Sequence, residues 1–483
     1  MHRRRLPLLI CAVSALFITS TLPANSATIA GTKCTKINST KTISNIKYTC
    51  VKSGKVLIWN KGVTIKAQVS PTPIPTKSSA VENSQTILPS KPVSSSPTPS
   101  PAAIDVRVNA QKYELSPETE FQNLQNCKIS SPLQNAMNNG FPRSSNLVPS
   151  KGLVKGIAIF TEYSDLPATG DEIRVWKTQQ IPTAQKYFKT MSYGKLDFQV
   201  DINEKVYRIN KSVLNYNLDT AHGAPTKPNA DTQGLVKDAV NAADIDIDFS
   251  KYDFVSVITP STSLIGFEGV IGFDYSADGK QFHYATFGPI REYKDDPAKY
   301  PWLVHEAGHM MGLIHPYNTS GNFYKNFAII AWDLMGNAIT FAPEFLAWHK
   351  FMLGWFEPNQ VQCLNSNVKS VTTSLITPIS EDKSGIKAEL IRISETEVII
   401  VENRRTSSLN NISREEEGIF VYHVDAKIGP DMGAVTVLFN RQIVRNGHLI
   451  GTLLPGEVVK HNNVTIEVLS SAVDGDYVTI KIS

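Results

Sequence analysis

At 483 residues the chain is too long for one ordinary hydrophobic core, so two to four folded modules are expected. With 41% hydrophobic and 19% charged residues, it has the composition of a globular protein overall. The formal net charge is only +4 and no recognisable nucleic-acid-binding module is present, so nucleic acid is a poor candidate partner.

Residues 1–27 have the pattern of a signal peptide that is removed on export. Three arginines precede an apolar stretch from Leu6 to Phe17, and the small residues of a cleavage site follow at 24–27. The alternative is a membrane anchor, but a span needs roughly 20 apolar residues and this run is shorter. No later stretch is apolar for long enough to cross a bilayer. The sequence therefore predicts a secreted protein with no transmembrane segment.

Residues 28–66 are predicted to form a small β module. The runs 46–51 and 56–59 alternate polar and apolar residues around a turn at Gly54, as in a β-hairpin. Residues 28–81 contain nine lysines and no acidic residue. This excess of positive charge suits an anionic cell-wall polymer, although a merely soluble surface explains it equally well. The module resembles a short lysine-rich module common at the N-termini of secreted actinobacterial proteins.

A linker is expected at 67–104, where eight prolines stand among serines and threonines. Such a segment buries too little apolar surface to fold and forms an extended spacer. The body at 105–365 mixes helices and strands, and 366–483 is β-rich. The expected strands are 154–160, 196–207, 252–258, 387–392, 397–402, 418–424, 434–440, 464–469 and 476–482, and the expected helices are 171–189 and 233–243.

The candidate metal-binding and catalytic residues lie in one stretch, His305-Glu306-Ala307-Gly308-His309-Met310-Met311-Gly312-Leu313-Ile314-His315. Two histidines four residues apart project from one face of a helix and can reach a single Zn²⁺. Gly312 can end that helix at a positive φ and let His315 approach the same ion. Three neutral nitrogens and one open position are typical of a catalytic zinc site. Glu306 is then placed to take a proton from the water that attacks a peptide carbonyl.

This stretch matches the His-Glu-x-x-His-x-x-Gly-x-x-His signature of the metzincin clan of zinc proteases. The surrounding sequence resembles the immune inhibitor A-like secreted bacterial metalloproteases, over roughly 150–483. The resembling segments are 187–196 before the catalytic helix, 332–336 at the Met-turn, 347–355 in the helix that follows, and 401–404 and 418–425 in the C-terminal β region. The resemblance implies an α/β (α+β) metzincin-like catalytic domain followed by a β-rich C-terminal domain. It also implies that His305, His309 and His315 bind one catalytic Zn²⁺, with Glu306 as the base and Met335 under the metal.

The residue that would stabilise the oxyanion cannot be assigned from the motif. Some metzincins carry a tyrosine two residues after the Met-turn methionine that helps to stabilise the oxyanion, and this chain has Asn337 there. Tyr317, Tyr324 and His349 are the substitutes to consider, although a structural role is the simpler expectation for each. Members of the clan often bind structural Ca²⁺, but no run of acidic ligands in this chain resembles an EF-hand loop, so Ca²⁺ is left open and is not predicted.

Four cysteines remain once the signal segment, which contains Cys11, is removed. An even number in an oxidising compartment favours two disulfides, and four cysteines allow three connectivities. Cys34 with Cys50 is the expected local pair, which leaves Cys127 with Cys363. The alternative is a Cys127 thiolate that caps the zinc in a zymogen.

The leading functional hypothesis is a secreted endopeptidase that acts on protein or peptide substrates. A second hypothesis is a zinc amidase that acts on cell-wall peptides. A third, from a different class, is a weak or inactive protease-like protein that binds the cell wall through residues 28–66. Inactive proteases usually lack a metal ligand or the glutamate, whereas this chain keeps all four residues.

Overall fold

The structure is a computed structural model. It describes residues 32–37, 39–43, 46–53, 56–60, 63–64, 106–117, 123–218, 229–260, 269–289, 301–318, 327–336, 344–410, 412–439, 443–445 and 448–483. The predicted signal segment and linker lie outside these residues, as do Gly54, Tyr324 and Asn337. The chain forms two compact units, 1–98 and 99–483, which are considered separately. The predicted boundary at 365/366 falls inside the second unit and stays a prediction.

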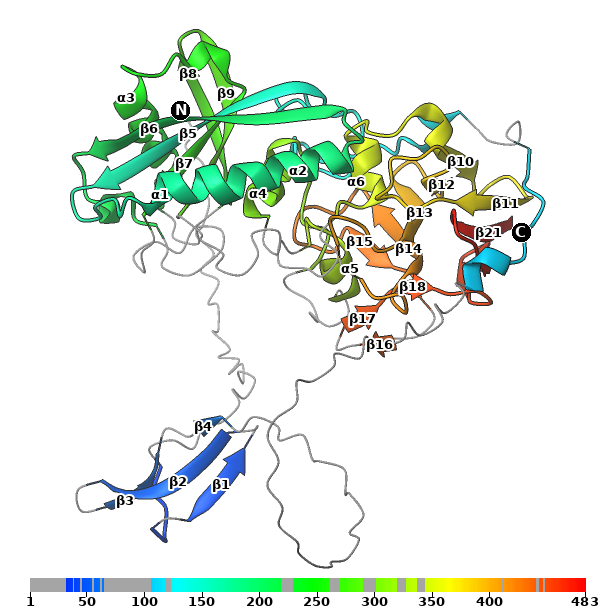
Figure 1. Ribbon diagram of the computed structural model, residues 1–483, viewed down its shortest axis with the longest axis horizontal. Helices are drawn as coiled ribbons and strands as arrows, with labels where there is room; N and C mark the ends of the chain where they lie inside the picture. Colours follow the sequence, from blue (N-terminus) through cyan, green and yellow to red (C-terminus); the bar gives the residue numbers. More distant parts are fainter. Residues whose placement is uncertain are drawn as a thin grey trace, which may run out of the picture. The chain divides into compact units, whose positions relative to one another are not determined.

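The first unit contains a small antiparallel sheet (Figure 1). Its strands are β1 (Thr40–Ile43), β2 (Ile46–Ser53), β3 (Val56–Trp59) and β4 (Val63–Thr64), and β2 pairs with the other three. The predicted hairpin is confirmed, with Cys50 opposite Trp59 in the register. The predicted disulfide between Cys34 and Cys50 is also present and closes the module.

The second unit is a mixed α/β structure rich in strands. Its first sheet has the order β6-β5-β7-β9-β8, parallel except for the antiparallel edge strand β8. The strands are β5 (Gly152–Tyr163), β6 (Leu196–Ile209), β7 (Phe254–Thr259), β8 (Gly269–Ala277) and β9 (Lys280–Pro289). Side chains on β5 alternate between two hydrophobic cores, with Ala158 and Phe160 in one and Ile157 and Ile159 in the other. Period-two patterning therefore buries both faces of this sheet.

Helices cover the two faces of this sheet. α3 (Thr232–Ala243) packs into the core that contains Ile157, and α2 (Ile181–Met191) and α4 (Trp302–Met310) pack into the core that contains Phe160. The predicted helix 171–189 is built from α1 (Asp171–Val175), a π-helical turn (Trp176–Gln180) and α2. The apolar stripe explains the π turn, because Trp176 and Ile181 are five residues apart and both lie in one core.

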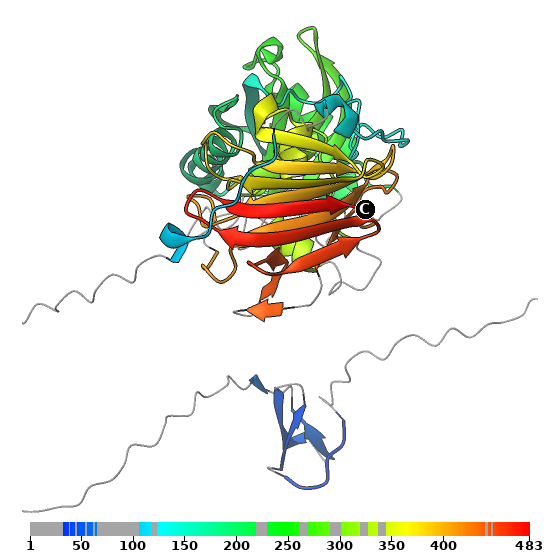
Figure 2. The same cartoon turned by 90° about the vertical axis from the view of Figure 1, so that its right-hand side faces the viewer.

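Two further sheets form a sandwich at the C-terminal end (Figure 2). One has the order β10-β12-β13-β14-β15 with β18 on β14, and the other has the order β11-β21-β20-β19. On β13, Val398 and Ile400 face the helices, whereas Ile399 and Val401 face the second sheet. The bounds of these strands are β10 (Val361–Asn365), β11 (Ser370–Ile376), β12 (Ala388–Arg392), β13 (Glu397–Arg404), β14 (Gly418–Asp425), β15 (Val435–Val437), β18 (Thr452–Leu453), β19 (Val458–His461), β20 (Val464–Ser471) and β21 (Asp476–Ile482). A two-stranded ribbon of β16 (Ile443–Arg445) and β17 (His448–Ile450) completes the described strands.

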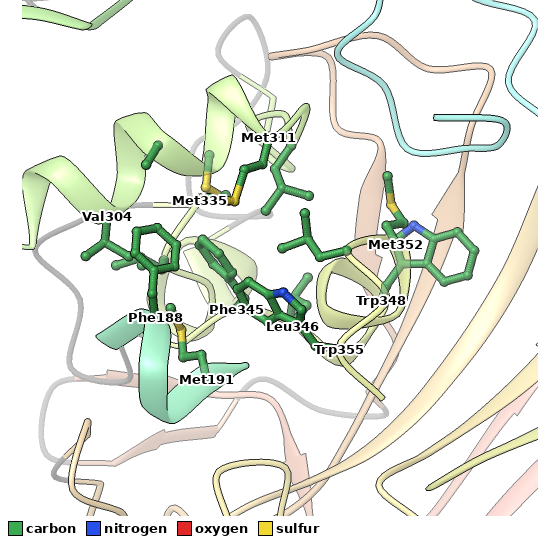
Figure 3. Packing of buried hydrophobic residues seen from close by; sticks show 14 of the residues in the cluster. Phe188, Met191, Val304, Met311, Met335, Phe345, Leu346, Trp348, Met352 and Trp355 are labelled. Carbon is green, nitrogen blue, oxygen red and sulfur yellow. The ribbon is translucent and has the colours of Figure 1, made fainter. Parts of the chain in front are cut away.

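The helices α2, α4, α5 (Phe327–Trp332) and α6 (Ala347–Met352) lie between the first sheet and the sandwich. One hydrophobic core runs through this layer, and Figure 3 shows part of it, with Phe188 of α2, Val304 of α4 and Trp348 of α6. Cys127 and Cys363 form the second predicted disulfide, which joins a short 3₁₀ helix (Leu124–Cys127) to β10. The existing bond contradicts the alternative of a free Cys127 thiolate. No helix in the described part of the chain is long and apolar enough to span a membrane.

A candidate metal centre

His305 and His309 lie on α4, one turn apart. The helix begins after Pro301, whose carbonyl accepts hydrogen bonds from the N–H groups of Val304 at 3.0 Å and His305 at 3.1 Å. The two imidazole centroids are 4.9 Å apart. Every residue of α4 except His309 is buried, so the helix is held rigidly in the core and fixes the direction of both imidazoles.

The helix ends in a turn built on Gly312. The Leu313 N–H donates to the Gly308 carbonyl at 3.0 Å and the Gly312 N–H donates to the His309 carbonyl at 2.8 Å, which is a Schellman motif. Gly312 has a φ of 90°, in the left-handed region that favours glycine. A Cβ added there would lie 2.0 Å from Arg143 Nη2. Both the backbone conformation and the available space therefore require glycine at this position.

Past this turn the chain returns His315 to the two helical histidines. Its Nε2 atom is 3.1 Å from His305 Nε2 and 3.1 Å from His309 Nε2. One nitrogen from each ring lies within 4.8 Å of the others, and this is the one such group of three or more potential metal ligands among the described residues. The structure thus brings together the three histidines that the sequence singled out.

The remaining nitrogen of each ring is engaged by an oxygen atom. His305 Nδ1 is 2.8 Å from the Leu334 carbonyl, and His309 Nδ1 is 2.8 Å from the Leu313 carbonyl. His315 Nδ1 is 2.9 Å from Asp431 Oδ1. Because carbonyl and carboxylate oxygens accept, the hydrogen is assigned to each Nδ1, and each ring directs its Nε2 at the other two.

Burial keeps the helical histidines neutral. It lowers the pKa of His305 to about 4, and the neighbouring His315 acts in the same direction. Burial and the same neighbour hold the pKa of His309 well below its usual value. Both rings are therefore uncharged at neutral pH, which is the form that binds a metal ion.

The donor set fits a zinc ion. Imidazole nitrogen is a preferred ligand of zinc and its neighbours in the first transition series. Nitrogens bound tetrahedrally at the usual zinc–nitrogen distance are separated by about 3.3 Å. The observed separations of 3.1 Å are close to that value. A divalent cation placed between these closely spaced Nε2 atoms would be bound by all three, so the donor geometry fits the ion.

Glu306 follows His305 on α4 and is 6% exposed. Burial, Asp431 and Glu306, in that order, raise the pKa of Tyr317 to about 12, so the phenol keeps its proton at neutral pH. The Tyr317 ring stacks on His315 with centroids 5.1 Å apart. Of the candidates for the oxyanion role, Tyr317 therefore lies beside the histidine cluster, whereas Tyr324 is outside the described residues.

The segment 332–336, for which the sequence predicts a Met-turn, ends α5 and turns at 334–336. The Met335 side chain is fully buried, and the Leu334 carbonyl just before it is the acceptor for His305. Figure 3 shows Met335 next to the α4 ribbon, with Met311 beside it. The turn therefore supports the cluster through the hydrogen bond to His305, and its Met335 side chain packs against Gly308 of α4.

His349 lies behind this turn and away from the cluster's hydrogen bonds. It and Asp333 are both fully buried, and His349 Nδ1 is 3.4 Å from Asp333 Oδ2. Asp333 Oδ1 accepts the Met335 N–H at 3.2 Å. This arrangement gives His349 a structural place, as the partner of the carboxylate that holds the turn.

The segments 347–355, 401–404 and 418–425 meet in a buried polar network. Glu402 of β13 accepts the N–H of Ala347, the first residue of α6, at 2.6 Å, and also accepts the Tyr422 hydroxyl at 2.8 Å. Tyr422 in turn accepts the Trp348 N–H at 3.0 Å. A carboxylate at a helix N-terminus satisfies otherwise unpaired N–H groups, so this network fixes α6 on the C-terminal sheet.

Asp431 is the residue at the cluster that the motif does not indicate. It lies 116 residues after His315, in the connection between β14 and β15. An aspartate at a positive φ of 61°, in the run Pro430-Asp431-Met432-Gly433, indicates a turn. Nothing in that local signal indicates which part of the fold the turn contacts.

Comparisons with known proteins add little to this geometry. No protein-family model matches the chain, and a search of curated proteins finds no match. Among solved structures, the crystal structure of wild-type OgpA from Akkermansia muciniphila is similar, at 13% sequence identity and a TM-score of 0.24, over 71% of this chain and 97% of that chain. Similarity at this level carries no argument about function, which therefore rests on the site.

Proposed function

We propose that the protein is a secreted zinc-dependent endopeptidase of the metzincin type. The observation that carries the proposal is the convergence of three imidazole Nε2 atoms, His315 Nε2 being 3.1 Å from each of the other two, next to a buried glutamate. His305, His309 and His315 would hold the ion, and Glu306 would act as the general base. When bound, zinc supplies Lewis-acid activation of a water molecule and of the substrate carbonyl.

The residues of the chain supply the remaining chemistry. Glu306 takes the proton from the attacking water and delivers it to the leaving amine, a role worth about 10²–10⁴ in rate. Tyr317, held in the neutral form by its raised pKa, can donate its hydroxyl hydrogen to the developing oxyanion. The Leu334 and Leu313 carbonyls and the Asp431 carboxylate keep the imidazoles oriented.

The metzincin assignment rests on the spacing of the motif and on a turn like the Met-turn. The buried Met335 and the glycine-based end of α4 are the features that the resemblance to immune inhibitor A-like proteases leads us to expect. Secretion is supported by the signal-like segment and by the two disulfides, which form in oxidising compartments. A structural Ca²⁺ has no support beyond its occurrence in the clan.

We also propose that the first unit binds an anionic cell-wall polymer. Its described lysines at 33, 36, 41, 47 and 52 are all exposed, so the positive charge is available at the surface. Sedimentation of residues 28–66, fused to a carrier protein, with purified cell walls tests this at low salt. Fusion protein that stays in the supernatant, like the carrier alone, would leave the lysines with a role in solubility only.

The central test combines metal analysis with a protease assay. Protein purified without chelators should contain one zinc ion per chain and should digest casein or gelatin. Treatment with a chelator should abolish activity, and zinc should restore it. Glu306→Ala should keep the metal and lose about 10²–10⁴ in rate. Glu204→Ala, at a surface position with 62% side-chain exposure, is the matched control and should be fully active.

The outcomes separate the competing functions. Full activity in Glu306→Ala would refute the proposed mechanism. A metal-loaded protein that cleaves cell-wall peptides but no protein would support the amidase. Inactivity of a folded, zinc-loaded wild-type protein on both substrates would support a binding protein.

A further inference from the structure

The C-terminal β region reaches the histidine cluster through one connection. Residues 426–434 link β14 to β15, and this segment lies along residues 316–318, which directly follow His315. The Gly433 N–H donates to the Tyr317 carbonyl at 2.9 Å, and the Val435 N–H donates to the Pro316 carbonyl at 3.1 Å. Asn318 and Met432 form an isolated antiparallel bridge. Backbone hydrogen bonds thus fasten the two segments together.

The backbone of the connection is shaped for this contact. Asp431 has a φ of 61° and Gly433 a φ of 85°, both in the left-handed region. Aspartate and glycine are the kinds of residue that adopt this conformation in turns, so the chain reverses here without strain. A Cβ added to Gly433 would lie 3.2 Å from Asn318 Cβ, so glycine permits the close approach. These features direct the Asp431 carboxylate at His315 Nδ1.

His315 is the histidine that most needs such support. The other two are fixed by a buried helix and have backbone carbonyls as acceptors. His315 follows a turn, its side chain is 26% exposed, and its acceptor is a carboxylate from another part of the chain. A charged acceptor both orients an imidazole and increases its basicity. The least constrained of the three rings therefore has the strongest acceptor.

We propose that Asp431 is a positioning residue for the metal centre, so that the centre is completed by the C-terminal β region. The carboxylate acts through His315 and does not contact the reacting atoms. The inference rests on the proposed zinc-peptidase function and adds that residues beyond 365 are part of the active site. A catalytic body that ends at 365 would hold His315 loosely and bind zinc weakly.

Two substitutions at position 431 test the inference in the full-length mature protein. Asp431→Ala removes the acceptor, and we expect zinc affinity, measured by competition with a chromophoric chelator, to fall about 10- to 100-fold. Asp431→Asn keeps an acceptor oxygen without the charge and should recover part of the affinity. Asp474→Ala, at an exposed aspartate of the same β region, is the matched control and should bind zinc like the wild type.

A third variant and a spectroscopic measurement distinguish the loss of His315 positioning from a general loss of structure. Gly433→Ala disturbs the connection but leaves Asp431 in place, and we expect a smaller loss of zinc affinity. The visible absorption spectrum of the Co²⁺-substituted protein should change in Asp431→Ala, because the geometry of the histidine ligands changes. The far-ultraviolet circular dichroism spectrum should match that of the wild type, because the Asp431 side chain is 43% exposed.

The results distinguish this inference from the proposed function. If the wild-type protein binds zinc and depends on Glu306, while Asp431→Ala has unchanged zinc affinity and an unchanged Co²⁺ spectrum, only the role of Asp431 is refuted. If the wild-type protein binds no zinc, the proposed function and the inference both fail. A 10- to 100-fold loss of zinc affinity in Asp431→Ala, a smaller loss in Gly433→Ala and partial recovery in Asp431→Asn establish the positioning role.

Discussion

Gly308 of α4 lies directly against Met335. A Cβ built on Gly308 would be 2.6 Å from Met335 Sδ and 3.0 Å from Phe345 Cζ. Both neighbours are fully buried in the same core, so neither side chain has open space to enter. The glycine, an unfavourable residue inside a helix, therefore allows α4 to approach the turn that carries the Leu334 carbonyl.

Gly308→Ala should destabilise the protein and weaken metal binding. Alanine favours a helix by about 1 kcal/mol over glycine, but overpacking a filled core costs about 1–3 kcal/mol. We expect a net loss of about 1 kcal/mol and a lower zinc affinity, measured by urea denaturation and chelator competition. Gly272→Ala is the control, because a Cβ there meets nothing within 4 Å. Equal behaviour of the two variants would show that the Gly308–Met335 contact is unimportant.

His349→Ala should reduce stability more than it affects catalysis. The substitution removes the ring beside the fully buried Asp333 carboxylate and leaves a cavity in a filled core, which should cost about 1–3 kcal/mol. We expect a clearly lower urea midpoint and, in the fraction that stays folded, a kcat within a few-fold of the wild type. A variant with normal stability and a kcat reduced 100-fold or more would instead place His349 in the oxyanion role.

Loss of the disulfide between Cys127 and Cys363 should destabilise the second unit. The bond closes a loop with a sequence separation of 236, so it strongly restricts the unfolded chain, and its removal should cost about 2–5 kcal/mol. The double variant Cys127→Ala/Cys363→Ala should unfold at a lower temperature but still bind zinc. The control Cys34→Ala/Cys50→Ala affects the other unit and should leave this transition unchanged.

Thiol titration gives an independent check on the same bond. The denatured, unreduced mature protein should show no free thiol, because all four cysteines are paired. A thiol found at Cys127 would restore the hypothesis of a thiolate cap on the metal.

The buried Glu389 should make stability depend on pH. It lies on β12 between the two sandwich sheets, in register with Gln362, and burial raises its pKa to about 7, with a smaller opposing effect from Ser374. In the unfolded chain the carboxyl ionises near its ordinary value of 4.5. Between these values the folded state holds the proton more tightly, so stability falls as pH rises from 4.5 to 7 and stays low above 7.

Glu389→Gln should remove this penalty. We expect the free energy of unfolding of the variant to match that of the wild type near pH 4.5. By pH 8 it should exceed the wild-type value by about 3 kcal/mol. Urea denaturation across this pH range measures the difference. Glu467→Gln, at an exposed position on β20, should show no such trend. A difference between Glu389→Gln and the wild type that stays constant with pH would contradict the raised pKa.

The sequence predicted the histidine cluster because its three ligands lie within eleven consecutive residues, so helix geometry and one glycine turn nearly determine their positions. It also predicted strands such as β5 and β14, in which alternate side chains pack into two different hydrophobic cores. Asp431 could not be found in this way, since its role depends on a contact across 116 residues. Local patterns do not show which loops of a fold will meet.

The hairpin of β8 and β9 was absent from the predicted strands, although a signal was available. Asp278 and Gly279 separate the two strands and have φ values of 47° and 76°. An Asp-Gly pair of this kind is a strong indication of a tight β-turn between antiparallel strands. The break in the register between Gly272 and Tyr275 explains why simple alternation did not reveal β8.

The contact between His315 and Asp431 also sets the order in which the proposed metal centre can be assembled during biosynthesis. A growing chain acquires His305, His309 and His315 together, but the carboxylate that fixes the third ring is translated much later. Until that point the incomplete chain lacks the arrangement that we propose for tight zinc binding. On the proposed function, a partly synthesised chain is therefore a weaker peptidase than the finished one.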